Sequence, residues 1–406
     1  MKLAYITLVY DDYIDRFYRI NHTLINDSYS QQKSHLDYDA FGWADFWSNA
    51  LNPIGYEVLE ITVNIRSLQI QWAKENNCLN SQVSLEYIAL QQVKQFQPDI
   101  LWFDNYDTDL LREICQEVSS IKLVLGWSGS AVLKTNIWKY IDLVLSCAPE
   151  SVAYFQSNGI KSQQIHHAFD PRVNNRLKFN SKAFETCFIG QILRKSDFHL
   201  YREKLLEELC FCTQLLIFSS SANYVLKNTL KQRLKNLLSD LIDKLSIYIE
   251  KYKLDNNTLF KQYIREYVNY LQAKLSKPVS QILIPFLKPA VFGLEMFQTL
   301  ANSKIALNIH ADSSPLFASN MRLFETTGVG TCLLTDWKTN IHELFEPDYE
   351  VVTYRSVEEC IEKIAWLLDH PQESETIAKA GQLRTLKDHT FAQRSIQLDE
   401  IIKQNI

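Results

Sequence analysis

A cation and a carboxylate stand one helical turn apart in the segment between Ala318 and Asp336, which reads ASNMRLFETTGVGTCLLTD. Arg322 and Glu325 are three residues apart, so they share one face of a helix, and Asn320 lies just before them. Such a pair can turn a guanidinium toward phosphate and a carboxylate toward the hydroxyls of a ribose. The same residues could also form an ion pair within one helix that binds no ligand.

The residues that follow this pair favour the ligand-binding interpretation. Gly328-Val329-Gly330 leads into the apolar run 331–336, and glycines at a turn allow a ligand to approach the backbone closely. A helix, a turn and then a buried strand is how an α/β sheet presents polar groups at its carboxyl edge. We therefore predict a nucleotide site at this edge, with Asn320, Arg322 and Glu325 as binding residues.

A second group of residues could bind phosphate. The run TCFIGQ (186–191) predicts a strand that ends at Gly190, and Arg194, Lys195 and Arg202 follow it. Backbone amides and guanidinium groups could together offset the charge of a diphosphate leaving group. No Asp-x-Asp motif stands at a predicted strand end. We therefore expect no metal site and no separate cofactor.

Two residues are candidates for catalysis. His310 follows directly on the apolar run KIALNI, so we expect it at the carboxyl end of a strand, although an isolated histidine is often only a hydrogen-bonded structural residue. Asp45 lies in the run WADFW (43–47), where aromatic side chains could stack on an acceptor and the carboxylate could act as its base. The same run could be a core helix. Asp11, Asp12, His22 and Asp104 compete with Asp45 for the role of base, and spacing does not choose among them.

The wider pattern is that of an α/β protein with two Rossmann-like domains facing across a cleft. Strand-like runs separated by helix-length segments occupy both halves: 3–10, 56–64, 100–105, 122–127 and 143–147 in the first, and 186–191, 214–220, 304–310, 331–336 and 350–354 in the second. We expect an acceptor domain at 1–172, a polar linker near 169–182, and a donor domain at 183–388. Residues 389–406 should form a last helix that packs back toward the first domain.

The stretch from about 224 to 275 interrupts this pattern. It carries Leu and Ile at spacings of three and four with many lysines between them, so we expect a helical insertion in the second domain. It could pack on its own domain, or it could dock a partner, a second subunit of a homo-oligomer or an anionic membrane surface.

Composition excludes several classes of protein. With 406 residues, 46% hydrophobic and 22% charged, the chain should fold into more than one domain. The net charge of -5 argues against nucleic acid as the main partner. The eight cysteines show no Cys-x-x-Cys spacing, so we expect free thiols in a cytoplasmic protein and no zinc site. No apolar run approaches the roughly 20 residues that span a bilayer, so membrane contact should be peripheral at most.

Several of these motifs together resemble a known family. The runs SKIALNIH, SNMRLFETTGVGTCLLTD, ELFEP, EVVTY and HTFAQR resemble the C-terminal domain of the CgeB-like branch of group 1 glycosyltransferases, which have the GT-B fold. The resemblance covers roughly residues 285 to 400 well, and SYSQQKSHLDYDAFGWADFW extends it more loosely into the first half. It implies transfer of a hexose from a UDP- or GDP-sugar to a hydroxyl acceptor such as a glycan, lipid, small molecule or protein, with retention and without a metal.

The resemblance also implies roles for single residues. Glu325 would bind the ribose of the donor, Arg322 would meet its phosphates, and the loop Pro289 to Gly293, with Phe292 and Gly293, would lie near the base. Related retaining enzymes carry a Glu-x7-Glu pair, and the first glutamate falls on Phe317 here. Asn308, His310 or Asp312 could partly replace it, or the chain could be a non-catalytic scaffold that binds carbohydrate or a partner. An epimerase or phosphorylase of the same architecture is a third hypothesis.

Overall fold

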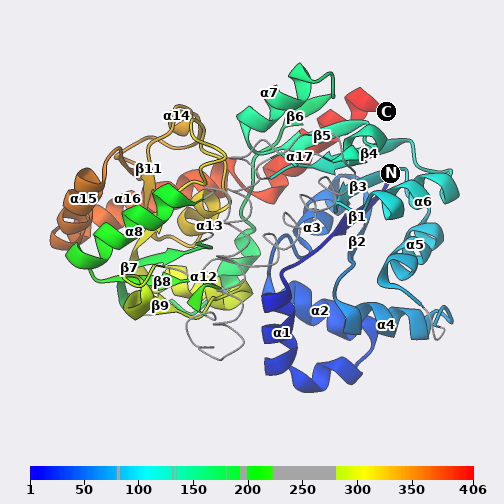
Figure 1. Ribbon diagram of the computed structural model, residues 1–406, viewed down its shortest axis with the longest axis horizontal. Coiled ribbons are helices and arrows are strands. Elements are labelled where there is room, and N and C mark those ends of the chain that lie inside the picture. The colour runs from blue at the N-terminus through cyan, green and yellow to red at the C-terminus, as the bar shows by residue number, and fades with distance from the viewer. Residues whose placement is uncertain (80–82, 130–131, 134, 180, 193–198, 223–279) are drawn as a thin grey trace, which may run out of the picture.

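The chain forms two lobes, each built on a parallel β-sheet that packs against helices (Figure 1). The computed structural model describes residues 1–79, 83–129, 132–133, 135–179, 181–192, 199–222 and 280–406. The predicted helical insertion, Arg194 and Lys195 lie outside the described residues. The predicted fold class, an α/β protein with two Rossmann-like sheets, is confirmed.

The N-terminal sheet has six parallel strands in the order β2-β1-β3-β4-β5-β6. Their bounds are β1 (Lys2–Thr7), β2 (Glu57–Thr62), β3 (Ile100–Asp104), β4 (Leu123–Trp127), β5 (Leu143–Ser146) and β6 (Ser162–Gln164). The central strands read as nearly continuous apolar runs because both faces of a parallel sheet are covered by helices. The register pairs Thr7 with Asp104, which places these two residues side by side at the carboxyl edge of the sheet.

The helices of this lobe connect the strands. They are α1 (Asp11–Ile20), α2 (Tyr29–Asp39), α3 (Phe46–Leu51), α4 (Arg66–Glu75), α5 (Leu85–Phe96), α6 (Thr108–Glu117) and α7 (Pro149–Ser157), with short 3-10 helices η1 (His22–Asn26), η2 (Asn52–Ile54) and η3 (Asn136–Tyr140). Of these helices, α2, α5 and α6 begin at side-chain caps. Ser28 and Gln31 form a capping box on α2, and the Asp107 side chain accepts two backbone N–H bonds at the start of α6. Such caps satisfy amides that a helix leaves without an internal partner.

The C-terminal sheet also has six parallel strands, in the order β12-β11-β10-β7-β8-β9. Their bounds are β7 (Phe184–Ile189), β8 (Leu215–Phe218), β9 (Leu287–Lys288), β10 (Ser303–Asn308), β11 (Cys332–Asp336) and β12 (Val352–Tyr354). The helices are α8 (Leu200–Cys212), α12 (Gly293–Ala301), α13 (Arg322–Gly328), α14 (Ile341–Leu344), α15 (Val357–Asp369) and α16 (Pro371–Asp388), with η6 (Ile284–Phe286). None of the described helices has both the length and the apolar character needed to cross a bilayer.

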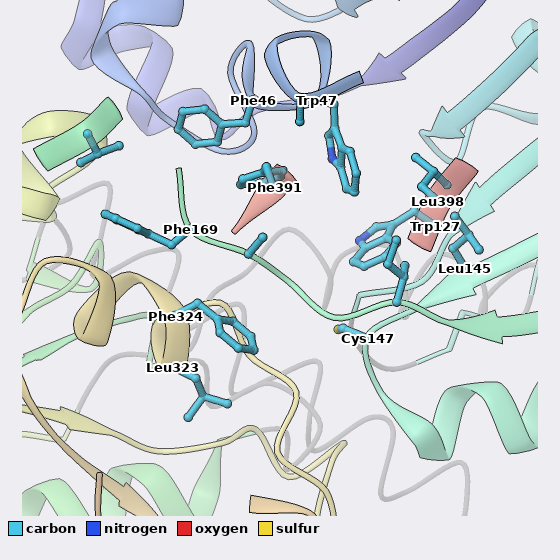
Figure 2. Close-up of a cluster of buried hydrophobic side chains, with 14 of the residues drawn as sticks. Phe46, Trp47, Trp127, Leu145, Cys147, Phe169, Leu323, Phe324, Phe391 and Leu398 are labelled. Atoms are coloured by element: carbon cyan, nitrogen blue, oxygen red, sulfur yellow. The ribbon is translucent and has the colours of Figure 1, made fainter. Parts of the chain in front are cut away.

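The last helix, α17 (Phe391–Asn405), lies against the N-terminal lobe (Figure 1). Figure 2 shows Phe391 beside Phe46 and Trp47 of α3, and the ring centroids of both pairs are 5.1 Å apart. The Tyr56 hydroxyl also donates to the Asp399 carboxylate over 2.8 Å. One continuous cluster of buried apolar side chains therefore runs from the first sheet through α17 to α13 in the second lobe.

The segment that joins the lobes packs closely rather than running free over the surface. Its 3-10 helix η4 (Pro171–Arg176) follows Phe169, which is 1% exposed and pairs by backbone bonds with the start of α17. The Phe169 ring fills the space beside Gly328 where any larger residue would place its Cβ. Asn174 Nδ2 donates to the Gly328 carbonyl over 3.0 Å. Gly328 thus serves packing between segments, and the expectation that it admits a ligand is wrong.

Candidate active site

A cavity of about 620 Å³ lies between the two lobes, where the carboxyl ends of strands from both sheets meet. Thr7, Asp104 and Trp127 line it at the ends of β1, β3 and β4, and Ile189 and Asn308 line it at the ends of β7 and β10. Parallel α/β sheets bind ligands outside the carboxyl ends of their strands, and ligand pockets commonly span 300–1,000 Å³. The position and size of the cavity suit a substrate of nucleotide size.

Arg322 and Glu325 line this cavity together from the first turn of α13. Arg322 Nη1 lies 2.8 Å from Glu325 Oε2, and the two side chains are only 17% and 10% exposed. The same nitrogen is 3.0 Å from the sulfur of Met296, while the buried Arg322 Nε has no hydrogen-bond partner among the described residues. The pair is therefore a buried ion pair at the wall of a cavity, with donor capacity to spare for a ligand.

Asn320 is fixed beside this pair by a second polar residue. Asn320 Nδ2 donates to Asn308 Oδ1 over 2.8 Å, and Asn308 Nδ2 donates to Thr335 Oγ1 over 2.9 Å. The register of β10 and β11 sets Asn308 next to Thr335, so the sheet holds this network in place. Both asparagines line the cavity and can present an amide or carbonyl group to a bound molecule.

Arg202 supplies a second buried cation. It projects from α8, lines the cavity and is 8% exposed. Its Nη2 donates to the Ile309 carbonyl over 2.6 Å and its Nη1 to the Gln191 carbonyl over 2.8 Å, and no carboxylate among the described residues forms an ion pair with it. Burial lowers the pKa of the guanidinium to about 10, against the opposing charges of Asp336 and Asp312. A buried cation held by carbonyl groups, with no carboxylate paired to it in the described part of the chain, can bind an anion.

A smaller cavity of about 250 Å³ adjoins the first and shares Tyr10, Gly129, Arg202 and Asn320 with it. His310 lines this cavity, with its Nδ1 2.7 Å from Asp336 Oδ1 and its buried Nε2 lacking a hydrogen-bond partner among the described residues. Burial alone would raise the pKa of Asp336, but the charges of His310 and Lys338 outweigh it and hold that pKa well below its usual range. Asp336 thus orients His310, whose second ring nitrogen can meet a ligand.

The opposite wall belongs to the N-terminal lobe and is aromatic. Tyr5, Tyr10, Trp43 and Trp127 line it, and the rings of Trp43 and Trp127 are edge to face with centroids 4.9 Å apart. Asp104 stands among them at the end of β3, and its Oδ2 accepts bonds from the Tyr5 hydroxyl over 2.8 Å and from Thr7 Oγ1 over 3.2 Å. Burial raises the pKa of Asp104 to about 6, although these two bonds oppose the shift.

Six of the predicted site residues line one of the two cavities, and Asp45, Phe292 and Gly293 lie outside both. Gly190, Arg202, Asn320, Arg322 and Glu325 line the larger cavity, and His310 lines the smaller one. Their roles stay predictions, because a position at the cavity wall does not identify the ligand.

Asp45, the other residue predicted to be catalytic, lies elsewhere. It does not line the cavity, and its two oxygens accept bonds from Arg172 over 2.8 and 2.9 Å. The Arg172 guanidinium therefore occupies both oxygens of this carboxylate. Among its competitors, Asp11, Asp12 and His22 are exposed outside the cavity, and Asp104 alone of the five lines it.

Phe292 and Gly293 also lie outside the cavity lining. Their predicted position near the base of the donor nucleotide stays a prediction. Phe292 packs against Tyr13 and Phe41 of the N-terminal lobe, with ring centroids 5.9 and 5.3 Å away. Gly293 has a φ of +52°, and the space where a Cβ would stand is taken by Asp39. These two residues close one edge of the cleft by joining the lobes.

The sequence analysis missed the aromatic residues on the N-terminal side apart from Trp43. Tyr10 follows the first strand, Trp127 ends the fourth and Tyr106 follows Asp104. Their places at or just after the ends of predicted strands were a usable signal, because carboxyl ends of parallel strands share one edge. Phe317, which occupies the place of the first glutamate of the pair in related enzymes, lines neither cavity, and its backbone N–H donates to Glu150 Oε1 over 3.1 Å.

Comparison with known proteins gives one family match and many similar folds. Residues 286–400 match the family model described as Glycosyl transferase-like, and no curated protein sequence matches the chain. The solved structure of Anabaena HepE with UDP and glucose aligns over 100% of both chains, at 12% identity and a TM-score of 0.52. A glycosyltransferase from Rickettsia africae aligns over 99% of this chain and 98% of its own, at 10% identity and a TM-score of 0.53.

A third solved structure is equally similar. Sucrose-phosphate synthase from Thermosynechococcus elongatus aligns over 100% of this chain and 98% of its own, at 10% identity and a TM-score of 0.51. At such identities the likeness establishes the fold, which is the two-lobed GT-B architecture of these enzymes, with a glycosyl transferase-like segment in the second lobe.

Proposed function

We propose that the protein is a glycosyltransferase that moves a hexose from a nucleoside diphosphate sugar, a UDP- or GDP-sugar, to a hydroxyl acceptor. The observation that carries the proposal is the pairing of Arg322 with Glu325 at the wall of the interlobe cavity. The similar Anabaena structure was solved with UDP and glucose, which supports a nucleotide sugar as the ligand class.

The donor side of the site is assigned to the C-terminal lobe. Glu325 would accept bonds from the ribose hydroxyls, and Arg322 would turn its free Nε and remaining hydrogens toward the diphosphate. Arg202 lies buried without a carboxylate partner among the described residues, so an incoming diphosphate would supply the missing negative charge. His310 Nε2, in the adjoining cavity, offers one more contact for the sugar or its phosphate.

We further propose that transfer retains the configuration at the sugar carbon and needs no metal, as the resemblance to the CgeB-like branch implies. The acceptor oxygen forms a bond to the sugar carbon while the bond from that carbon to the diphosphate oxygen breaks, and the diphosphate keeps the electron pair. The proton of the acceptor hydroxyl passes to the departing diphosphate on the same face. Guanidinium groups fixed in a buried site stabilise the charge that develops there.

One observation favours a second candidate, a scaffold that binds a nucleotide or carbohydrate without transfer. Phe317 stands where related enzymes carry a glutamate near the transferred sugar, and its backbone is bonded to Glu150. Asn308 and His310 line the cavities and could take over part of that role. An assay for hydrolysis of the nucleotide sugar separates the two candidates. A transferase would release the nucleotide, whereas a scaffold would bind the nucleotide sugar and leave the sugar attached.

The experiment is a thermal-shift screen against UDP, GDP and their hexose conjugates, followed by an assay for nucleotide release. We expect UDP or GDP to raise the melting temperature of the wild type, and Arg322→Gln to reduce that shift. Arg355→Gln is the matched control, because Arg355 is an exposed arginine of the same lobe that lies over Trp337. A wild type that none of these nucleotides stabilises would contradict the proposed function.

A further inference from the structure

The two walls of the cavity carry opposite charge. Among the described residues of the C-terminal wall the ionisable side chains are two arginines and one glutamate, Arg202, Arg322 and Glu325. Those of the N-terminal wall, apart from its tyrosines and the neutral His167, are three acids and one lysine, Asp37, Glu60, Asp104 and Lys33. Tyr10 of the N-terminal wall lines both cavities. A charge pattern of this kind selects ligands by sign.

The lysine does not make the N-terminal wall basic, because two acids hold it. Lys33 Nζ lies 2.5 Å from Asp37 Oδ1 and 3.5 Å from Glu60 Oε2. Glu60 is also held by Ser48, whose backbone N–H and hydroxyl donate to its two oxygens. The positive charge of Lys33 is thus offset within the wall, and Asp104 remains as a carboxylate without an ion-pair partner among the described residues.

Asp104 has one oxygen available for a ligand. Its Oδ2 accepts both protein hydrogen bonds, from Tyr5 and Thr7, and Oδ1 has no protein hydrogen bond within the described part of the chain. These bonds fix the plane of the carboxylate at the end of β3. A fixed carboxylate oxygen facing a cavity accepts a bond from a hydroxyl and repels an anion.

The rings around Asp104 favour a ligand with a flat or ring-shaped body. Trp43 is partly buried, and its own position is set by Tyr5, with ring centroids 5.3 Å apart, and by Trp127. Tyr106 stands two residues after Asp104 and lines the same cavity. Aromatic side chains beside a hydrogen-bonding carboxylate match a sugar ring, which offers an apolar face and hydroxyl donors at its edge.

We propose that Asp104 Oδ1 accepts a bond from a hydroxyl next to the reacting one on the acceptor ring, and that this ring, in the N-terminal half of the cavity, is an uncharged sugar. This proposal rests on the proposed transferase function. It assigns Asp104 a positioning role, in which it orients the nucleophile toward the donor held by the opposite wall. It also excludes acceptors that carry a carboxylate or phosphate on the ring that reacts. With its pKa near 6, Asp104 is mostly ionised in neutral buffer and can fill this role.

Binding of matched sugar pairs tests the proposal without any need for turnover. The probes are methyl glucoside against methyl glucuronide, and methyl galactoside against methyl galacturonide, measured by saturation-transfer NMR and by quenching of tryptophan fluorescence with UDP present. We expect the neutral member of at least one pair to bind roughly tenfold or more tightly than its acid, because a like charge beside Asp104 is unfavourable. If neither neutral sugar binds, or if the acids bind as well, the proposal is wrong.

Asp104→Asn keeps the shape of the side chain and can still accept bonds from Tyr5 and Thr7. We expect it to weaken binding of the neutral sugar by roughly tenfold and to shrink its preference over the acid. Asp109→Asn is the matched control, because Asp109 lies on the same lobe, is 77% exposed and pairs with Arg112. An Asp104→Asn protein with unchanged affinity and preference would overturn the assignment.

The same samples show whether a failure concerns this proposal or the transferase function. The UDP-induced thermal shift depends on the C-terminal wall and should be the same in the wild type and in Asp104→Asn. Loss of sugar preference with an intact UDP shift would reject the acceptor assignment alone. Absence of a UDP shift in the wild type would reject the proposed function, whatever the sugars do.

Discussion

The guanidinium of Arg322 and the carboxylate of Glu325 lie 2.8 Å apart, three residues apart on α13, and both line the cavity between the lobes. They are bonded to each other, so a donor would have to share or replace part of this bond. A preformed pair costs less to order than two separate long side chains. We therefore propose that the pair combines a structural role with a binding role.

The structural role predicts a loss of stability when one partner is removed. Glu325→Leu would leave the Arg322 guanidinium buried without its carboxylate, and we expect the free energy of unfolding in urea to fall by about 3 kcal/mol. The double variant Arg322→Met/Glu325→Leu should recover most of this loss, because no buried charge is left unpaired. Equal stability of Glu325→Leu and the exposed control Glu362→Leu would mean that the pair contributes nothing measurable.

Arg202 gives a prediction about nucleotide affinity. Arg202→Met should weaken UDP binding by roughly 10–100-fold in isothermal titration, because charge-assisted bonds to the diphosphate are lost. Stability without ligand should change by only about 1 kcal/mol, since the cost of burying the cation disappears along with its bonds to the Ile309 and Gln191 carbonyls. An unchanged UDP affinity would show that this cation does not face the phosphates.

The raised pKa of Asp104 predicts how stability depends on pH. Its pKa is 3.8 in the unfolded chain and about 6 in the fold, so between these values the folded state holds more protons, and its stability falls as pH rises. Asp104→Asn lacks this effect. The melting temperature of Asp104→Asn should match that of the wild type near pH 4 and exceed it above pH 6. The corresponding difference in the free energy of unfolding is at most about 3 kcal/mol. A constant difference from pH 4 to 7.5 would contradict the shift.

Glu150 forms hydrogen bonds between the lobes, so hydrogen exchange at its partners should report opening of the cleft. From the first turn of α7 it accepts bonds from the Leu316 and Phe317 amides over 3.1 Å and from Ser314 Oγ over 3.2 Å in the other lobe. Glu150→Ala should speed hydrogen exchange of those two amides by roughly tenfold. Glu86→Ala, at an exposed first-turn glutamate of α5, should not. Unchanged exchange in Glu150→Ala would show that the contact does not hold the lobes together.

Much of the architecture could be predicted from the sequence because parallel strands buried on both faces leave long apolar runs. The run 331–336 became β11 (Cys332–Asp336), and 100–105 became β3 (Ile100–Asp104). Helices α1, α2 and α4 had no prediction, and α3 had only the alternative that the run 43–47 is a core helix. The apolar residues of α2 show no helical periodicity, and α3 is only six residues long.

The site was predictable on one side only. Arg322 and Glu325 act within one helical turn, so their spacing alone brings them together. The fate of Asp45 depends on Arg172, which is 127 residues away, and that of Phe292 depends on Tyr13 and Phe41 in the other lobe. Asp104 became distinct from its competitors only because the register sets it beside Thr7 at the edge of the sheet. Contacts between residues so far apart in the sequence follow from strand register and from the packing of whole segments, which no local sequence pattern contains.

The most direct test of the central claim compares UDP with its 2′,3′-dideoxy analogue by isothermal titration against the wild type and Glu325→Gln. If Glu325 accepts hydrogen bonds from the ribose hydroxyls, the wild type should bind UDP roughly tenfold or more tightly than the analogue. Glu325→Gln should lose most of this preference. Equal affinity of the wild type for the two nucleotides, or an unchanged preference in Glu325→Gln, would contradict the account.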